Sequence, residues 1–392
     1  MKILEIIFVL LFCCSCGYLL FTLVLLKHFK AREAYYKKLA GTDFFSGVRG
    51  ICWPKVSQIK PVAVLNDNSR HLLSSFVEQD YPNDNEVIYA SGNKETALAI
   101  KDMAVPWKNL AEHGSVRVFS VSGEGVNRKI AACIPAQSSS SHDIIVLSDA
   151  DMEADSDFLR RLLQPFADHR VGLSTSLYIV KEAKGLGAGL EGISVADFAA
   201  SVLAARRTEG MSFALGAAMA VRREALNDIG GLEALRDYLA DDYQLGNKVF
   251  SKGWKIALAD SVVNDVTPSQ PFSEYFSHQL RWNRTYRICR PGGHFAFMIT
   301  QGLVWALCFL LASGFSAWGW GLVALWCVFR ALWNIYVWKS LACGGKGWRW
   351  GFLAGFKDLL YIALWILSFA GNTVKWGDKK YKIQRDGRMQ EV

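Results

Sequence analysis

Residues 142–152, which read His-Asp-Ile-Ile-Val-Leu-Ser-Asp-Ala-Asp-Met, constrain the fold more than any other stretch of the chain. The four apolar residues from Ile144 to Leu147 are mostly β-branched and too few to form the buried face of a helix. They predict a central strand that is covered on both faces. A strand of this kind belongs to the sheet of an α/β domain.

Two carboxylates follow this strand directly, at Asp149 and Asp151. Because side chains alternate along an extended backbone, we expect both to project to the same side, about 7 Å apart. Mg²⁺ takes one or two carboxylates and completes its coordination with substrate phosphates and water. The pattern predicts a Mg²⁺ or Mn²⁺ site at the carboxyl end of the strand, where open α/β sheets bind ligands. An Asp turn facing solvent is the alternative that two carboxylates alone leave open.

Strands alternate with helical segments on both sides of the central strand, which predicts an α/β domain with a mainly parallel sheet. Further strands are expected at 60–66, 86–91, 116–121, 172–180 and 253–259, and helices at 72–78, 158–166 and 192–206. Asn127 and Lys129 lie where a helix should begin just before the central strand. A cation and backbone N–H groups could meet phosphate there, although a solvated helix start is also possible.

A second pair of acids, Asp241 and Asp242, opens another predicted helix. It follows residues 211–223, a segment of small side chains that lets the main chain approach a ligand closely. On local grounds the two acids could also simply cap the helix.

Composition and hydropathy predict a membrane part. The 392 residues are 51% hydrophobic with 14 Trp, and the mean hydropathy is +0.15. Residues 3–26 form an almost uncharged run followed at once by basic residues, which predicts a transmembrane helix with a cytoplasmic basic end. A cleaved signal peptide would have a shorter apolar run and an A-x-A site. Residues 295–313 and 321–338 predict a transmembrane hairpin, and 352–373 a third segment that either spans or re-enters, because basic residues flank both its ends.

The net charge of +8 gathers beside the apolar spans, which favours an anionic membrane surface over nucleic acid as a partner. The only CxxC spacing among the nine cysteines, Cys13 with Cys16, lies inside the apolar run 3–26, so neither a zinc site nor a disulfide framework is predicted. Residues 272–290 are basic and aromatic at helical spacing, which is typical of an interfacial helix.

Together these motifs resemble the ceramide glucosyltransferase family, a GT-A family of the glycosyltransferase 21/2-like type, and most closely its bacterial members of hopanoid-lipid pathways. The resemblance rests on Lys60-Pro61, Asp80-Tyr81-Pro82, Asn127-x-Lys129, Asp149-Ala150-Asp151, Gly216, Ala240-Asp241-Asp242-Tyr243, Gln279-Leu280-Arg281-Trp282, Lys357-Asp358-Leu359-Leu360 and Arg385-Asp386-Gly387-Arg388. It implies a GT-A fold, a nucleotide-sugar donor, a lipid hydroxyl acceptor and inversion at the transferred carbon.

The resemblance also implies roles for individual residues. Asp149 and Asp151 would hold the metal and donor diphosphate, and Asp242 would be the general base. The donor diphosphate and acceptor would be contacted by Gln279, Arg281, Trp282, Lys129 and Asn127. The family usually has an acidic residue after the second strand, where this chain has Asn93 with Glu95 two positions on. We therefore expect a weaker and less selective nucleoside site.

The expected layout is an N-terminal transmembrane helix (1–26), a basic linker (27–59), a GT-A catalytic domain (60–271), an interfacial helix (272–294), a transmembrane hairpin (295–338), a third membrane segment (352–373) and a basic tail (374–392). The expected activity is transfer of one sugar, from a UDP-sugar, to ceramide, diacylglycerol or a hopanoid-pathway lipid. A processive polysaccharide synthase would need more membrane helices, and a catalytically degenerate scaffold is favoured only by Asn93.

We expect a multi-pass protein of the bacterial inner membrane with a cytoplasmic catalytic domain. Its expected partners are the nucleotide-sugar donor, the lipid acceptor and the bilayer, with no nucleic acid and no obligate protein partner.

Overall fold

The computed structural model describes all residues except 1, 41–52, 110–113, 122, 267–268 and 343. The chain forms two compact units. The first, which we call the sheet unit, comprises Phe29–Tyr178 and Glu209–Val266. The second, the helical unit, comprises Met1–His28, Ile179–Thr208 and Thr267–Val392. Residues 179–208 lie inside the predicted catalytic segment 60–271, yet they belong to the helical unit.

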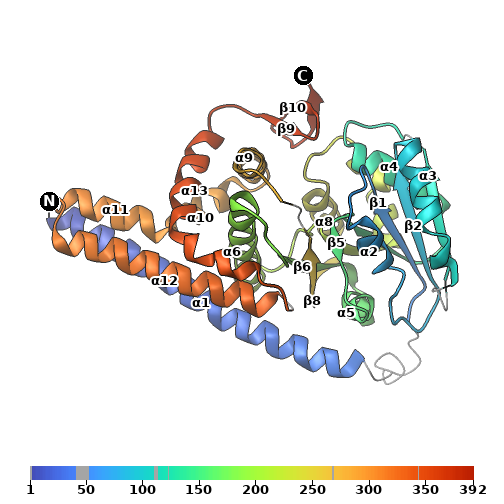
Figure 1. The fold of residues 1–392 in the computed structure, drawn as a ribbon, viewed down its shortest axis with the longest axis horizontal. Helices are drawn as coiled ribbons and strands as arrows, with labels where there is room; N and C mark the ends of the chain where they lie inside the picture. The colour runs from blue at the N-terminus through green and yellow to red at the C-terminus, as the bar shows by residue number, and fades with distance from the viewer. Residues whose placement is uncertain (1, 41–52, 110–113, 122, 267–268, 343) are drawn as a thin grey trace. The chain divides into compact units, whose positions relative to one another are not determined.

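The sheet unit is built on an eight-stranded mixed sheet in the order β3-β2-β1-β4-β7-β6-β8-β5 (Figure 1). Strands β3, β2, β1 and β4 are parallel, whereas the pairs β4–β7, β6–β7 and β5–β8 are antiparallel. The strands are β1 (Val56–Pro61), β2 (Asn85–Ser91), β3 (Val116–Ser120), β4 (Ile144–Ser148), β5 (Met152–Glu153), β6 (Val171–Val180), β7 (Ala218–Arg222) and β8 (Lys255–Asp265).

Strand β4 is the predicted central strand, and all five of its residues are buried. The strand predicted at 60–66 is wrong in its position, because β1 ends at Pro61. It begins earlier, at Val56, with polar side chains that gave no apolar pattern. Gln58 donates to the Phe76 carbonyl at 2.8 Å, and Ser57 donates to Glu86 at 2.6 Å. Such polar side chains can be buried in a strand because they find partners there.

Helices α3 and α4 pack against the parallel half of the sheet (Figure 1), where Leu73, Tyr89, Ile100 and Trp107 form part of the core. The helices of this unit are α2 (Ser69–Ser74), α3 (Lys94–Met103), α4 (Arg128–Ser139), α5 (Phe158–Leu163), α7 (Arg223–Asp228) and α8 (Asp241–Ser251), with short 3₁₀ turns η1 (Pro106–Asn109), η2 (Gln164–Ala167) and η3 (Leu232–Leu235). This arrangement places the first turns of α4 and α8 close to Asp149, at the carboxyl end of β4.

The helical unit contains the apolar helices. They are α1 (Lys2–Ala40, whose last residues belong to the sheet unit), α6 (Leu186–Thr208), α9 (Phe272–Cys289), α10 (Pro291–Ile299), α11 (Gly302–Ala312), α12 (Ala317–Leu341), η4 (Gly347–Leu353) and α13 (Ala354–Ser368). Residues 27–40 of the predicted linker continue α1, and its residues 41–52 lie outside the described part. The predicted first hairpin helix is broken, since α10 and α11 meet at a 53° bend.

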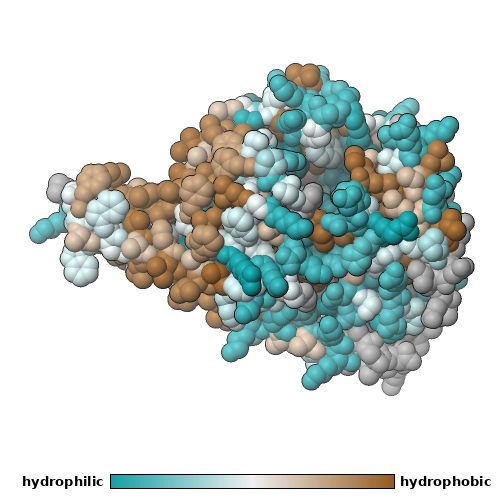
Figure 2. All heavy atoms as spheres, viewed as in Figure 1, coloured by the Kyte–Doolittle hydropathy of each residue, from teal (hydrophilic) through white to brown (hydrophobic). Residues whose placement is uncertain are grey.

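Among the described residues, four helices are long and apolar enough to cross a membrane, and a fifth span results if the bent pair counts as one. Helix α6 is one of the four and was predicted only as an Ala-rich helix. Figure 2 shows apolar residues gathered on the surface of α11, α12 and the first half of α1. Leu10, Leu325, Val328 and Leu332 are all more than half exposed. An exposed apolar surface of this extent is typical of a membrane protein.

The predicted basic tail is not a tail but a folded, three-stranded antiparallel sheet of β9 (Thr373–Trp376), β10 (Lys379–Ile383) and β11 (Met389–Glu391). Its apolar side chains Val374, Tyr381, Ile383 and Met389 are buried, while the basic residues between them are mostly exposed. The period of two that defines a strand was masked by this high content of basic residues. Helix α9 contacts the start of this segment, where Arg284 donates to the Ala370 carbonyl at 3.0 Å.

Candidate active site

The carboxyl ends of β1 and β4 lie next to each other, and Lys60 joins them. Its Nζ donates to the Ser148 hydroxyl at 2.7 Å and to the Asp149 carbonyl at 2.8 Å, and it lies 3.4 Å from the centre of the Phe76 ring. Burial lowers the pKa of Lys60 to about 7, although Asp151 and Asp149 act in the opposite direction. Lys60 therefore holds the backbone that carries the two aspartates, a role the sequence did not reveal.

Asp149 and Asp151 lie in a turn between β4 and β5, not on extended backbone as predicted. The Met152 amide donates to the Asp149 carbonyl at 3.4 Å, and the Asp149 amide donates to the Ala217 carbonyl at 3.2 Å. The predicted extended conformation of these residues is therefore wrong, because the chain turns before it enters the short strand β5. Both side chains project from this one turn, and both reach solvent.

The carboxyl group of Asp151 reaches solvent at the rim of the turn but has protein packed around the rest of it. This desolvation, and then the neighbouring Asp149 charge, raise the pKa of Asp151 to about 6. A cation or another positive group near the turn would favour the charged form of Asp151.

Lys129 bridges the two acidic segments. In the first turn of α4, its Nζ lies 2.7 Å from Asp149 Oδ1 and 3.3 Å from Asp241 Oδ2. Burial alone would lower the pKa of Lys129, but the Asp149 and Asp241 carboxylates outweigh it and hold that pKa well above its usual value. Lys129 is thus a permanent cation beside the Asp149–Asp151 turn, as a phosphate-neutralising group must be.

Asn127 caps α4 instead of facing open space. Its Oδ1 accepts from the Ile130 amide at 3.0 Å, and its Nδ2 donates to the Tyr238 carbonyl at 2.8 Å and to Asp241 Oδ1 at 3.3 Å. The side chain is fully buried. These hydrogen bonds connect the start of α4 to the start of α8. Through them, Asn127 helps to position Asp241.

Asp242 is held in one orientation by two backbone donors. Its Oδ2 accepts from the Gly216 amide at 2.7 Å, and its Oδ1 accepts from the Tyr243 amide at 2.7 Å. A Cβ at position 216 would lie 3.1 Å from Asp242 Oδ2, so glycine allows this close approach. Desolvation and then the Asp241 charge raise the pKa of Asp242 to about 6, against the effect of Lys129. A carboxylate with a pKa near neutrality suits a general base.

Asn93 lies after the end of β2 and caps α3. Its Oδ1 accepts from the Glu95 amide at 2.8 Å and from the Thr96 amide at 3.2 Å. The side chains of Asn93 and Glu95 are both exposed. The contact of these side chains with a nucleoside remains a prediction. Asn suits position 93 because its side chain caps the start of α3.

The Gln279, Arg281 and Trp282 side chains belong to α9 of the helical unit. Gln279 is buried and donates to Glu191 Oε1 at 3.1 Å, and His278 Nδ1 lies 3.0 Å from the same oxygen. The Trp282 ring packs 4.9 Å from the His278 ring, and Arg281 is half-buried. Glu191 of α6 organises this motif but stood out in no sequence pattern, since it is a single acid in a small-residue helix.

The described residues contain no group of three or more His, Cys, Asp or Glu that could enclose a metal ion. Two solvent-reaching carboxylates from one turn fit a different kind of site. They suit a hard cation that takes its remaining oxygen ligands from substrate phosphates and water. Asp149 and Asp151 would hold such an ion.

A mixed sheet that carries paired carboxylates after a central parallel strand, with further acids at a helix start beyond it, fits the predicted GT-A fold. The chain belongs to glycosyl transferase family 21, whose family model matches residues 11–389. The predicted fold class and the resemblance to this family are therefore confirmed.

Two curated relatives are ceramide glucosyltransferases of Caenorhabditis elegans. Ceramide glucosyltransferase 1 is 20% identical over 86% of this chain and 73% of its own length. Ceramide glucosyltransferase 3 is 23% identical over 58% of this chain, and the match spans half of that relative's length.

Among solved structures, the mannosyltransferase PcManGT from Pyrobaculum calidifontis, in complex with GDP-Man and Mn²⁺, is similar with a TM-score of 0.54. It is 17% identical, and the match covers 93% of this chain and 99% of that one. This likeness concerns the fold.

Proposed function

We propose that this protein transfers a single sugar from a nucleotide-sugar, a UDP-sugar in our proposal, to the hydroxyl group of a membrane lipid, with inversion. The observation that carries the proposal is the Asp242 carboxylate, which two backbone amides orient beside the Lys129–Asp149 pair in a family 21 chain. Inverting transfer needs one base for the acceptor proton and stabilisation of the leaving diphosphate, without a covalent enzyme intermediate.

Each residue has one task in this proposal. Asp242 accepts the proton of the attacking lipid hydroxyl at a carboxylate oxygen. Lys129, kept cationic by Asp149 and Asp241, offers a positive charge to the departing diphosphate. Lys60 holds the Asp149–Asp151 turn through its bonds to Ser148 and Asp149. A divalent cation bound to that turn would neutralise the diphosphate as a Lewis acid.

A lipid acceptor is supported by the apolar surface of the helical unit and by relatives that are named ceramide glucosyltransferases. Ceramide, diacylglycerol and a hopanoid-pathway lipid are the acceptors we propose. We further propose that the sheet unit is cytoplasmic and that the membrane is a bacterial inner membrane, because basic residues follow the apolar part of α1.

The test is to incubate the purified full chain with radiolabelled nucleotide sugars, Mg²⁺ or Mn²⁺ and a total lipid extract. We expect a lipid-soluble product, and excess EDTA should abolish its formation. Full activity in EDTA would remove the metal from the proposal and leave charge neutralisation to Lys129. A polymeric product would indicate a processive synthase, and absence of product with every donor would indicate a scaffold.

A further inference from the structure

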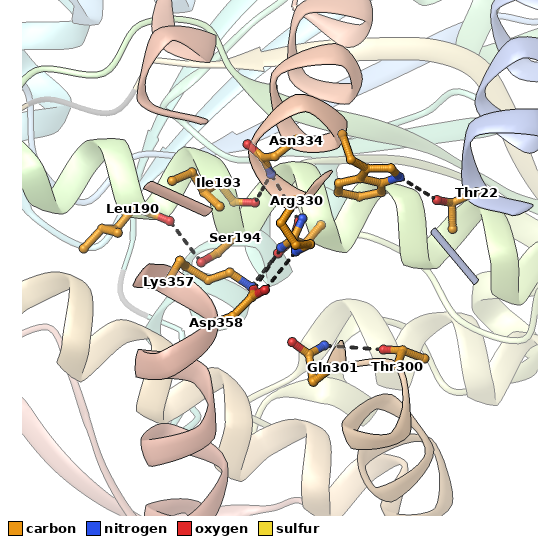
Figure 3. A network of polar contacts seen from close by, with 12 residues as sticks. Thr22, Leu190, Ile193, Ser194, Thr300, Gln301, Arg330, Asn334, Lys357 and Asp358 are labelled. Carbon is orange, nitrogen blue, oxygen red and sulfur yellow. Dashed lines mark hydrogen bonds and ion pairs between the residues drawn. The ribbon is translucent and has the colours of Figure 1, made fainter. Parts of the chain in front are cut away.

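Helix α13 has one face that charged groups fix inside the helical unit (Figure 3). Arg330 of α12 donates to both oxygens of Asp358 at 3.0 Å, and Lys357 lies 2.5 Å from Asp197 of α6. Arg330 also donates to Asp197 at 2.7 Å. None of the four side chains is more than 10% exposed. This network joins α6, α12 and α13, so the inner face of α13 has a fixed position within the unit.

The opposite face of α13 is apolar and exposed. Ile366, and Phe352 just before the helix, are more than half exposed, and Phe356 and Leu359 are nearly half exposed. An exposed apolar surface of this kind indicates contact with a partner or a membrane. Figure 2 shows apolar surface that continues from α11 and α12 onto this helix. The bilayer that contacts those two helices is therefore the expected partner of α13 as well.

The segment formed by η4 and α13 begins beside the last turns of α12. A Cβ at Gly347 would lie 2.6 Å from the Trp338 ring of α12. The Gly347 amide donates to the Lys181 carbonyl at 3.3 Å. Lys181 belongs to a charged loop in which Glu182 and Lys184 are exposed. The start of the segment therefore lies at a polar side of the helical unit.

The segment does not follow α12 as far as the beginning of that helix. After Asp358, α13 turns away and reaches α10 and α9, and Figure 1 shows it running across α12. The Trp365 indole donates to the His294 carbonyl of α10 at 3.1 Å. Arg284 of α9 donates to the Ala370 carbonyl at 3.0 Å, just beyond the end of α13. A helix that spanned the membrane antiparallel to α12 would end beside residue 317 instead.

Both ends of the segment reach the same side of the helical unit. The loop 181–184 follows β6 and α9 follows β8, and these two strands are neighbours in one sheet. A Cβ at Gly187, in the first turn of α6, would clash with the Gln270 carbonyl oxygen just before α9. The charged loop at the start of the segment and the helix at its end are therefore close together.

The charges around the segment agree with this arrangement. Basic residues precede it at 339–349, and residues 373–392 after it contain six basic and three acidic residues. Lys375, Lys380 and Lys382 are all exposed. If α13 crossed the membrane, these two basic regions would lie on opposite sides, against the positive-inside rule. A segment that returns to its own side removes the conflict.

We propose that η4 and α13 lie along the headgroup region of an anionic lipid bilayer and do not cross it. Phe356, Leu359 and Ile366 face the acyl chains, whereas Lys357 and Asp358 face the protein. An interfacial helix is stabilised by its buried apolar area, and flanking basic residues add attraction to anionic headgroups. The inference goes beyond the proposed function and does not depend on sugar transfer.

The first experiment maps the two ends of the segment. An azide-bearing residue is introduced at position 317, 346 or 384 of the full chain, each of which is exposed. A membrane-impermeant alkyne dye is then added to spheroplasts or to inverted membrane vesicles. We expect positions 346 and 384 to be labelled about tenfold more strongly from one shared side, and position 317 from the other, because α12 crosses. Labelling of position 384 from the same side as 317 would show that α13 spans, and would overturn the proposal.

The second experiment measures depth in nanodiscs that contain phosphatidylglycerol. A fluorescent residue is introduced at Phe356 or Ile366 and is quenched by lipids that carry a nitroxide at the head or at the chain end. We expect the two depths to differ by less than about 5 Å, whereas a spanning helix would separate them by about 15 Å. Leu325 and Tyr336 are the matched pair on α12, where we expect about 16 Å. A separation near 15 Å on α13 would reject the interfacial helix.

This proposal and the proposed function fail separately. Same-side labelling and equal depths without any lipid product would retain the interfacial helix and reject the transferase activity. A lipid product with position 384 on the side of 317 would retain the activity and reject the interfacial helix.

Discussion

The molecule has two clusters of lysine or arginine with aspartate, and they differ in what their carboxylates can still do. In the sheet unit, Asp149 is paired with Lys129 on one oxygen and is still about one-third exposed. In the helical unit, Asp358 is completely buried, and both its oxygens are bound by Arg330. The same residue types thus give an open arrangement in one place and a closed one in the other.

The two clusters therefore differ in whether protons and cations can reach their carboxylates. In the sheet unit, the pKa values of Asp151 and Asp242 are both raised, so protons can exchange there near neutral pH. In the helical unit, by contrast, every carboxylate oxygen of Asp197 and Asp358 accepts a hydrogen bond from a neighbouring side chain. Four changes test this contrast.

The largest effect is expected at Asp242. Asp242→Asn should lower kcat by roughly 10²-fold to 10⁴-fold, the usual contribution of a positioned general base. Donor binding, measured by nucleotide titration, and the melting temperature show whether the fold is intact. Asp241→Asn is the matched control and should have a milder effect, because Asp241 supports Lys129 and Asn127. A greater loss in the Asp241 variant would reassign the base.

Breaking the closed cluster should reduce stability. Arg330→Met leaves two buried carboxylates with Lys357 alone, which we expect to cost about 3–5 kcal/mol in the free energy of unfolding. Thermal unfolding in detergent measures this loss. Arg385→Met, at an exposed position of the same unit, is the control. Adding Asp358→Leu to Arg330→Met should recover part of the loss, and no recovery would show that the two charges do not act as a pair.

The pH dependence of the transfer rate should reflect the ionisation of Asp242 and Asp151 in the sheet unit. Because the pKa of Asp242 is raised to about 6, its carboxylate form predominates above this pH, and transfer should decline as the pH falls below 6. At pH 5 we expect about a tenth of the plateau rate. Asp151 titrates in the same range, so the acid limb should be steeper than that of a single group. A flat rate between pH 5 and 8 would remove Asp242 as the base.

The smallest effect is expected at the end of β2. Asn93→Asp keeps the cap of α3, so stability should change by only a few tenths of a kcal/mol. If Asn93 also contacts the nucleoside, the restored charge should tighten UDP several-fold relative to GDP and ADP. Competition assays with the three nucleotides decide this. Strong discrimination in the wild type with no change in the variant would place Asn93 outside the nucleoside site.

Local patterns in the sequence predicted much of the sheet unit but not the contacts that orient its side chains. The strand 144–148 followed from four apolar residues, and the helices expected to open within 125–129 and 238–246 begin at Arg128 and Asp241. Strand β1 was misplaced because Ser57, Gln58 and Lys60 are buried through partners far along the chain. From sequence alone, a polar residue in a strand is predicted to be exposed, because its hydrogen-bond partner elsewhere in the chain is not known.

By itself, the sequence determined the class of fold, the family, the acidic pairs and most of the apolar spans, because each depends on residues that are close together in the chain. Only the tertiary structure decided that Asp149 and Asp151 share a turn, that Gly216 orients Asp242, and that Asp197 joins Arg330 and Lys357 between helices more than a hundred residues apart. These contacts arise where distant segments pack, and no local period or spacing encodes them.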